Sequence, residues 1–521
     1  MPTRSSASAR LIASLLLALL PATTLSAQNA TPVFKVTTRI VILDVVVKDK
    51  KGNIVTNLAK DDFTVLEDDQ PQTIQSFEPP SAHAMPVSLD GKPVVNSAAD
   101  LPKIGDAPVT ILVLDELNTP FNDMSFARSS LTDYLKKQPE VLQQPTLFLV
   151  QNDARMLILH DFTQDRDALL KALKNHDPMY PLKAEDMSTN LPVSDPVKNR
   201  LRLAQTMQAL NQIAEAMRGI PGRKNVIWVG RNYRGVCMVD CGRRAVDPDQ
   251  ITAMHQLTRH MTQTLLEDRV TLYYIDAEDT QQTAFDGRDE YDPKNPFGGK
   301  YVIFNYLAPV TGGQEFRQGN FIDVKLKTAQ DESTAYYTLS YSPANHQEDP
   351  EHYRNTIIRI ANHPELTATT RGGYYADAPN ANNVVNTPDL AQADRKTLLL
   401  FEILQASTSP LTYTGIAVNA KKNDASGTWQ ISVGPQTLTW TSQTDGALQA
   451  EMTTVAVALD AKNNPIMHSS HELVSDRKPD AAAPASIHYE ADLKVPPKAT
   501  RIRFIVRDAV SGKIGTADVT P

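Results

Sequence analysis

Apolar and polar positions change their period several times along this chain of 521 residues. From Val33 to Glu78 apolar residues alternate with polar ones, and turn residues at 50–53 and 67–70 separate β-branched runs. This period of two predicts a small antiparallel β module. Residues 79–108 hold six prolines and no sustained period, which predicts a linker.

From residue 109 to about 376, apolar runs of strand length alternate with stretches of helical period. We expect strands at Val109–Asp115, Thr146–Gln151, Met156–Leu159, Asn225–Val229 and Val270–Asp276. We expect helices near 122–137, 165–175, 197–218 and 248–267. Strands that are separated by helices indicate right-handed crossovers, so the predicted fold class is α/β with a doubly wound, mostly parallel sheet.

The period of two returns after Arg395 without a long helical pattern, which predicts a C-terminal β-sandwich. The expected organisation therefore has six parts. These are a signal peptide (1–27), an N-terminal β module (28–78), a linker (79–108), the α/β domain (109–376), a second linker (377–394) and the β-sandwich (395–521).

The first residues have the pattern of a secretory signal peptide. Arg4 and Arg10 precede an apolar run from Leu11 to Leu20, and small residues follow at Ser26 and Ala27. Ten apolar residues are too few to cross a bilayer as a helix, so we expect cleavage rather than an uncleaved anchor. The expected location is outside the cytoplasm, in the periplasm or the extracellular space, with no membrane insertion after cleavage.

Charge excludes one class of partner. The chain carries 52 basic and 60 acidic residues, and loss of the two signal-peptide arginines leaves 50 − 60 = −10 with His neutral. A chain this acidic has no electrostatic footprint for nucleic acid. With 41% hydrophobic residues it has the composition of packed globular domains.

Both cysteines of the chain lie in the short stretch "CMVDC", at Cys237 and Cys241. In an oxidising, exported setting this spacing favours a small disulfide loop over a metal site, which needs further Cys or His ligands nearby. A pair of free thiols is the alternative.

The predicted strand Val109–Asp115 ends on an acid, and the chain continues through Asn118 and Thr119 into a helical pattern. In a doubly wound sheet ligands bind at the carboxyl ends of the strands. Asp115 is therefore placed where an acid can face a ligand rather than the core.

This stretch resembles the metal-ion-dependent adhesion site of the von Willebrand factor type A fold, whose pattern is D-x-S-x-S. More broadly, the chain is similar to the VWFA-related family described from acidobacteria. The resemblance is carried by "VVVKDKKGNIVTNLAKDDFTVLEDDQPQTIQSFE", "LDELNTP", "LAPVTGGQEF", "YYTLSYSP" and "RGGYYA", which reach from about 33 to 376. It implies an α/β fold with a binding or adhesion function.

The metal site that the resemblance implies is incomplete in this chain. Asp115 matches the family aspartate and Thr119 the second hydroxyl, but Leu117 replaces the first hydroxyl and supplies no oxygen for Mg²⁺ or Mn²⁺. Arg231 follows the strand after which the family has a further aspartate, and its charge opposes a cation. Two interpretations stay open. Either Asn118 replaces the missing ligand and a metal binds weakly, or no metal binds and Asp115 and Thr119 cap the next helix.

Other catalytic signatures are missing from the sequence, which has no G-x-S-x-G, H-E-x-x-H, Walker or G-x-G-x-x-G motif. The cluster "HSSHE", His468 to Glu472, is typical of a solvated turn rather than of a metal site. The sequence therefore predicts an exported, non-enzymatic binding protein that holds a protein or glycan partner through a degenerate adhesion site. The alternatives are an exported hydrolase with an unrecognised active site, and a purely architectural envelope component.

Overall fold

The computed structural model describes residues 39–521, except 88–90, 153–154, 180–195, 232–235, 238–247, 278–300, 303–305, 317–320, 348, 377–391, 424 and 479–483. Arg39–Pro521 form one compact unit. The predicted signal peptide lies outside the described residues. No helix among those described is long and apolar enough to cross a membrane.

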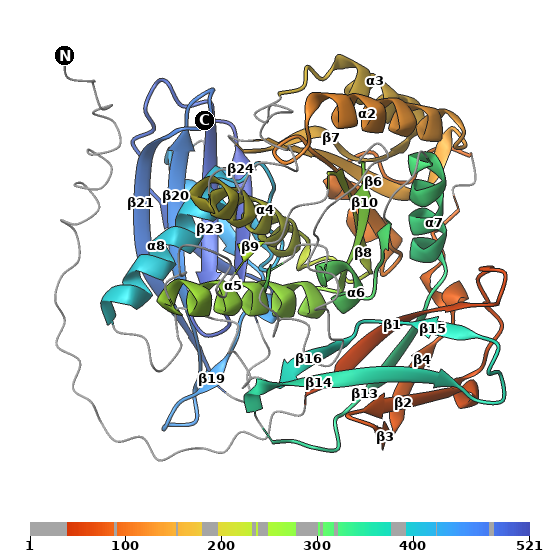
Figure 1. Ribbon diagram of the computed structural model, residues 1–521. Coiled ribbons are helices and arrows are strands. Elements are labelled where there is room, and N and C mark those ends of the chain that lie inside the picture. Colours follow the sequence, from red (N-terminus) through yellow and green to blue (C-terminus); the bar gives the residue numbers. More distant parts are fainter. Residues whose placement is uncertain are drawn as a thin grey trace. The chain divides into compact units, whose positions relative to one another are not determined.

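The N-terminal strands pair with strands that come almost 300 residues later (Figure 1). One antiparallel sheet has the order β15-β1-β13-β4 and a second has the order β16-β14-β2-β3. Their strands are β1 (Val41–Lys48), β2 (Phe63–Glu67), β3 (Gln70–Gln72), β4 (Ile74–Glu78), β13 (Tyr337–Tyr341), β14 (Asp349–Ile360), β15 (Thr367–Thr369) and β16 (Gly373–Ala376). Apolar residues of both sheets, such as Leu43, Val65 and Leu339, share one core, so these sheets pack against each other.

A buried ion pair joins strands within the second of these sheets. The Arg354 guanidinium donates to Glu67 Oε1 over 3.0 Å, and the two side chains are 4% and 3% exposed. The hydroxyls of Tyr341 and Tyr374 donate to Glu67 Oε2 over 2.7 and 2.8 Å. The Glu67 carboxylate therefore has three side-chain donors, which compensates part of the cost of burying its charge.

The six-stranded sheet has the order β12-β10-β8-β5-β6-β7. Its strands are β5 (Val109–Asp115), β6 (Val141–Gln151), β7 (Met156–Asp165), β8 (Lys224–Gly230), β10 (Val270–Asp276) and β12 (Glu315–Phe316). The helices of this region are α2 (Phe121–Lys136), α3 (Arg166–Asn175), α4 (Pro196–Met217), α5 (Pro248–Glu267), α6 (Leu307–Val310) and α7 (Ile322–Thr334). Strands β9 (Val236–Cys237) and β11 (Tyr301–Val302) form a separate two-stranded ladder.

Alternate residues of β5 face two different cores. Ile111 and Val113 pack in the cluster that contains residues of α4 and α5. Leu112 and Leu114 pack in the cluster that contains residues of α2, α3 and α7. All seven residues of β5 are buried, because both faces of the strand are covered.

The predicted fold class, a doubly wound and mostly parallel α/β sheet, is wrong. The chain is mostly β, with several antiparallel sheets and 28% helix. Even the six-stranded sheet is mixed, because β7 runs antiparallel to β6. The sequence itself placed only four residues between these two strands, and so short a connection permits only antiparallel pairing, which the prediction of a mostly parallel sheet overlooked. The strands after residue 336 pair with the N-terminal strands instead of extending a parallel sheet.

The C-terminal residues form two antiparallel sheets after helix α8 (Gln392–Thr408). The smaller sheet contains β17 (Val418–Lys422), β18 (Trp429–Val433) and β22 (Ile487–Ala491). The larger contains β19 (Thr441–Ser442), β20 (Leu448–Leu459), β21 (Pro465–Arg477), β23 (Arg501–Asp508) and β24 (Ile514–Val519). Trp429 and Ile431 of the smaller sheet share a core with Met452 and Phe504 of the larger one.

Short 3₁₀ segments complete the described structure. They are η1 (Lys60–Asp62), η2 (Pro80–His83), η3 (Ala98–Ile104) and η8 (Pro435–Thr437). Segments η2 and η3 lie in the stretch that the sequence predicted to be a linker, and Leu101 and Ile104 of η3 are buried in the core beside β5. Part of that stretch is therefore packed against the six-stranded sheet.

Candidate functional site

The predicted site residues come together at the carboxyl end of β5, and they are buried. Asp115, Asn118 and Thr119 are 2%, 3% and 0% exposed. The Asp115 carboxylate accepts hydrogen bonds from Asn118 N and Nδ2, over 3.0 and 2.9 Å, and from Trp228 Nε1 of β8 over 3.0 Å. Both carboxylate oxygens therefore have donors from the protein itself.

Asn118 and Thr119 extend this network. Asn118 Nδ2 also donates to Thr206 Oγ1 of α4 over 3.0 Å, and Thr119 Oγ1 accepts the backbone N–H of Arg231 over 2.8 Å. The Arg231 guanidinium lies 3.3 Å from Asp123 Oδ2. The predicted cation-repelling residue is thus close to the cluster and forms an ion pair with an acid of α2.

The capping role proposed for Asp115 and Thr119 is not seen in the hydrogen bonds described above, which go to Asn118, Trp228 and Arg231. The N-cap of helix α2 is Pro120, which makes no side-chain capping bond. Asp115 joins the end of β5 to Trp228 of β8 and to the turn at Asn118, and Thr119 bonds the backbone just after β8. Gly230, at the end of β8, permits this contact, because a Cβ there would lie 2.7 Å from Asp115 Cβ.

Burial dominates the electrostatics of Asp115. It raises the pKa of the carboxyl above its usual value of 3.8, although the hydrogen bonds from Asn118 and Trp228 act in the opposite direction. A cation ligand needs the reverse, a carboxylate that is stabilised in its charged form and has an open lone pair. A metal ion at Asp115 Oδ2 would compete with Asn118 Nδ2 and Trp228 Nε1, which both donate to that oxygen.

We expect Mg²⁺ and Mn²⁺ at millimolar concentration to leave the melting temperature almost unchanged. A cation that bound only the folded chain would add RT ln(1 + [L]/Kd), about 2.7 kcal/mol at a hundredfold excess over Kd. Thermal melts with metal and with chelator measure this. A metal-dependent rise in Tm that disappears in Asp115→Ala would show that the strand-end cluster does bind a cation.

Of the two cysteines in the predicted disulfide, the described residues include only Cys237. Cys237 lies in β9, where its backbone pairs with Tyr301. Cys241 lies outside the described residues. The pairing of these two thiols stays a prediction.

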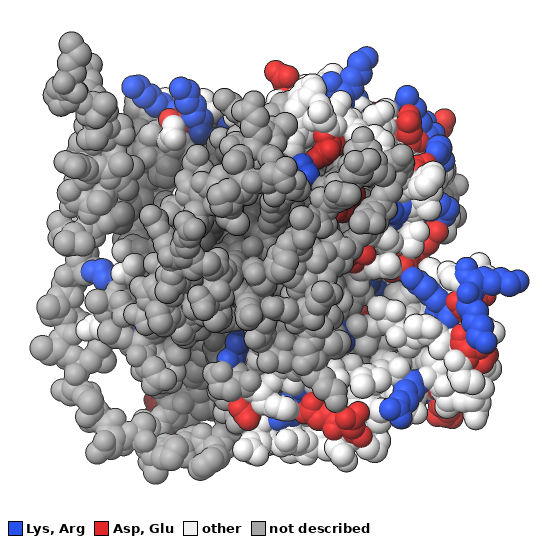
Figure 2. Space-filling model, in the orientation of Figure 1, with Lys and Arg blue, Asp and Glu red and all other residues white. Residues whose placement is uncertain are grey.

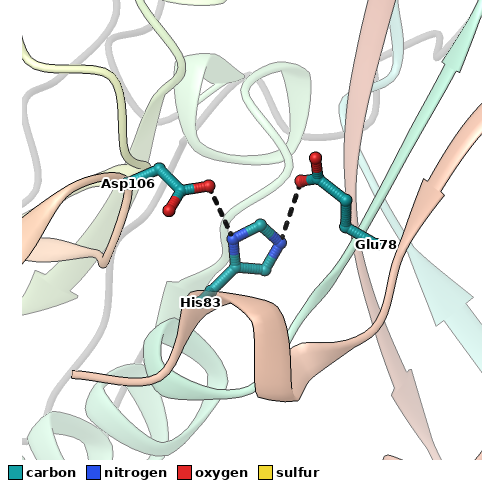
Figure 3. A group of neighbouring side chains, drawn as sticks. All are labelled: Glu78, His83 and Asp106. Carbon is teal, nitrogen blue, oxygen red and sulfur yellow. Dashed lines mark ion pairs between the residues drawn. The ribbon is translucent and has the colours of Figure 1, made fainter. Parts of the chain in front are cut away.

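A second cluster lies where the sequence gave no signal. Glu78 at the end of β4, His83 in η2 and Asp106 just before β5 bring two carboxylates to one imidazole (Figure 3). His83 Nδ1 lies 3.4 Å from Asp106 Oδ2, and His83 Nε2 lies 3.6 Å from Glu78 Oε2. The imidazole is fully buried, whereas each carboxylate side chain is 45% exposed.

Packing fixes the orientation of His83. Its ring stacks on Tyr336, with centroids 4.5 Å apart and an angle of 11° between the planes. Its Nε2 is 3.0 Å from Thr338 Oγ1, which also donates to Asp44 Oδ1 over 3.0 Å. Burial lowers the pKa of His83, and the Arg269 charge acts in the same direction, whereas the charges of Asp44, Asp106 and Glu78 oppose them. The neutral form of the imidazole is therefore favoured.

Thr338, His83 and Asp106 have the order of a hydroxyl nucleophile, a base and an orienting acid. The arrangement does not support catalysis. Thr338 is 5% exposed in the middle of a sheet, and Arg269 Nη2 donates to its hydroxyl over 3.2 Å. A substrate cannot reach this oxygen without opening the sheet, so the hydroxyl is a structural partner of the imidazole.

The sequence could not single out this cluster. Glu78, His83 and Asp106 are spread over 29 positions, counted from 78 to 106, and two of them fall in the proline-rich stretch. Metal-site patterns depend on short, regular spacing, which these residues lack. Only the path of the chain between β4 and β5 brings them together.

Comparisons with known proteins identify no relative. Neither a protein-family model nor a curated protein matches the chain. Among solved structures, the crystal structure of the human COPII-coat protein Sec24c matches with 8% identity and a TM-score of 0.24, over 58% of this chain and 50% of that chain. This likeness is too weak to support an argument, so the comparisons assign no family to the chain.

Proposed function

We propose that this chain is an exported, non-enzymatic protein-binding protein whose contact surface is the outer edge of β21. The proposal is supported by the length of this strand and by its unpaired outer side. Strand β21 has 13 residues and pairs with β20 along its length. Among the described residues no other strand pairs with β21, which lies at the border of its sheet (Figure 1).

Long open edges are normally protected by lysines, internal prolines, bulges or a covering element. Strand β21, "PIMHSSHELVSDR", has no lysine, and its one proline is its first residue. A register irregularity occurs only near that end, between Ala458 and Leu459 of the partner strand. One face of the strand is exposed along its length, including Val474, which is 57% exposed, and the other face is mostly half-buried.

The chemistry of the edge favours a polypeptide over a glycan. A strand of 13 residues presents backbone donors and acceptors over about 43 Å, at the spacing of another strand. A partner that adds a strand satisfies these groups with main-chain hydrogen bonds, and alternate side chains give specificity. The cluster "HSSHE" lies in this strand rather than in the predicted turn, so His468, His471 and Glu472 are contact candidates.

The strand-end cluster of β5 is the poorer candidate for a partner contact, because Asp115, Asn118 and Thr119 are buried. Charge gives no second surface on the face drawn in Figure 2, where acidic and basic side chains are mixed over the described part. Export is supported by the N-terminal sequence alone, through Arg4, Arg10 and the apolar run that follows.

Edge and face binding can be separated with two lysine variants. Val474→Lys places a charge on the edge strand, and we expect it to abolish capture of the partner from envelope extract. Glu451→Lys places the same residue directly opposite Val474 on β20, one strand inside the sheet, and should leave capture unchanged. Quantitative mass spectrometry of both captures, against the wild type, is the measurement. Equal loss in both variants, or loss in neither, would exclude the edge as the binding surface.

A further inference from the structure

The side chains of β21 have nearly the same order in both directions from Ser470. Two polar residues come first on either side, and two apolar residues follow them. Toward the amino end these are Ser469, His468, Met467 and Ile466, and toward the carboxyl end they are His471, Glu472, Leu473 and Val474. When a twofold axis relates two antiparallel strands, residues at equal distances from the centre lie opposite each other. The outer edge of β21 is therefore complementary to a second copy of itself.

The polar pairs of this arrangement are complementary in charge and hydrogen bonding. His468 of one copy lies opposite Glu472 of the second copy, and the symmetry repeats this pair, so each dimer contains it twice. Both side chains are exposed on the same face of the strand. Ser469 lies opposite His471 of the second copy, and these two side chains already approach each other within one strand, with Ser469 Oγ 3.2 Å from His471 Nε2. Opposite charges and hydroxyl partners stabilise directly opposed positions of a sheet.

Apolar residues meet at both ends of the polar centre. Met467 lies opposite Leu473 of the second copy, on the face where Leu473 packs against the sandwich core. Val474 lies opposite Ile466, at which β21 has one residue more than β20. Val474 and Ile466 are 57% and 38% exposed in the single chain. Pairing removes part of this apolar surface from water, which favours association.

Two alternative registers lack this complementarity. Centring the strand pair on Glu472 would place two like charges directly opposite each other, which is unfavourable. Centring it on His471 would place Val474 opposite His468 and leave no pair of opposite charges. Of these three registers, only the one centred on Ser470 sets apolar residues against apolar ones and an acid against a histidine.

We propose that the polypeptide that adds to β21 is a second copy of this chain, paired antiparallel about Ser470. The inference rests on the proposed function, because it uses the same edge as the contact surface. A twofold pairing occupies the open edge of both copies, so association stops at a dimer with one continuous sheet. The contact is confined to one strand of each copy, which indicates a dissociable dimer rather than an obligate one.

Charge exchange between His468 and Glu472 tests the pairing. His468→Glu places two glutamates opposite each other, and Glu472→Lys places a lysine opposite a histidine. We expect each change to weaken self-association about tenfold, because the contact occurs twice in the dimer. The variant with both changes sets glutamate opposite lysine and should recover at least the wild-type affinity. Sedimentation of the purified chain over about 1–100 μM measures the dissociation constant.

Glu451→Lys is the matched control for Glu472→Lys. It makes the same change on β20, one strand inside the sheet and opposite Val474, so it should self-associate as the wild type does. Circular dichroism of all variants checks that the fold is retained.

A disulfide test reports the register directly. In the proposed pairing the two Ser470 residues face each other with Cα atoms about 4.5–5.5 Å apart, a separation that a disulfide spans. In a chain whose Cys237 and Cys241 are replaced by serine, Ser470→Cys should form a disulfide-linked dimer under mild oxidation. Ser475→Cys is the control on the same strand, because its two copies lie about 34 Å apart and should not link.

Three outcomes would overturn the proposal. They are a wild-type chain that stays monomeric over this concentration range, a double charge variant that associates no better than its single parents, and linking of Ser475→Cys as readily as Ser470→Cys. Failure of the proposed function looks different. A monomeric chain whose capture of envelope polypeptides is lost in Val474→Lys would keep β21 as the contact surface, with a different polypeptide as its partner.

Discussion

Glu67→Ala is expected to lower the free energy of unfolding by about 3–5 kcal/mol, because it leaves the Arg354 charge buried without its carboxylate. The Tyr341 and Tyr374 hydroxyls lose their acceptor in the same change. Arg354 still donates to the carbonyl of Asn345 over 2.6 Å, which limits the loss. Urea unfolding of the wild type and the variant measures the difference.

A double variant shows whether the loss comes from the missing ion-pair attraction or from the Arg354 charge that stays buried without a partner. In Glu67→Ala/Arg354→Met the buried cation is gone as well, so we expect part of the lost stability to return. Lys327→Ala is the surface control, because Lys327 and Asp331 form an exposed pair and such pairs contribute about 0–1 kcal/mol. A double variant no more stable than Glu67→Ala would show that the tyrosine hydrogen bonds, rather than the ion pair, carry the effect.

Asp115→Ala is expected to cost about 2–4 kcal/mol, since it leaves buried donors of Asn118 and Trp228 without their acceptor. Loss of an exposed helix cap would cost only about 1 kcal/mol. Chemical unfolding therefore distinguishes the two roles of this side chain. A loss below about 1 kcal/mol would mean that water replaces the carboxylate and that the cluster is less closed than its burial indicates.

The pH dependence of Asp115→Asn gives a second test of the same cluster. Burial raises the pKa of Asp115 in the folded state above 3.8, so the native chain holds this proton more tightly than the unfolded chain. The stabilisation is complete below the unfolded pKa and is lost as pH rises through the folded pKa. The wild type should therefore lose stability relative to Asp115→Asn as pH rises from about 4. A relative gain with rising pH would indicate a carboxylate stabilised in its charged form.

Local pattern predicted the elements of the six-stranded sheet closely. The expected strands Val109–Asp115 and Val270–Asp276 have the bounds of β5 and β10, and the expected helix at 248–267 has those of α5. These segments are long, strongly periodic and bounded by turn residues, which is where period is informative. The polar end of β5 was also found, because an acid after a run with five apolar residues in six breaks the pattern.

Long-range pairing could not be predicted in the same way. Nothing in the alternation of Val41–Lys48 shows that its neighbour is Tyr337–Tyr341, because period reports which face is buried and not which strand lies beside it. The same limit hid the contact of His83 with Glu78 and Asp106. The exposed edge of β21 was missed because "HSSHE" has polar residues in a row, which is typical of turns, and tertiary pairing with β20 overrides that preference.

The sheet order β15-β1-β13-β4 has a consequence for how the chain is made. Strand β13 lies between β1 and β4, yet it leaves the ribosome roughly 300 residues later, a delay of about 15–60 s at ordinary synthesis rates. The elements of the six-stranded sheet emerge within that interval and can associate first. If the chain is exported with its amino terminus first, as proposed above, β1 and β4 would likewise cross before the strand that joins them. Chains released before Tyr337 would present β1 and β4 without their central strand to the surrounding proteases. Such truncated chains should therefore be degraded rapidly rather than accumulate.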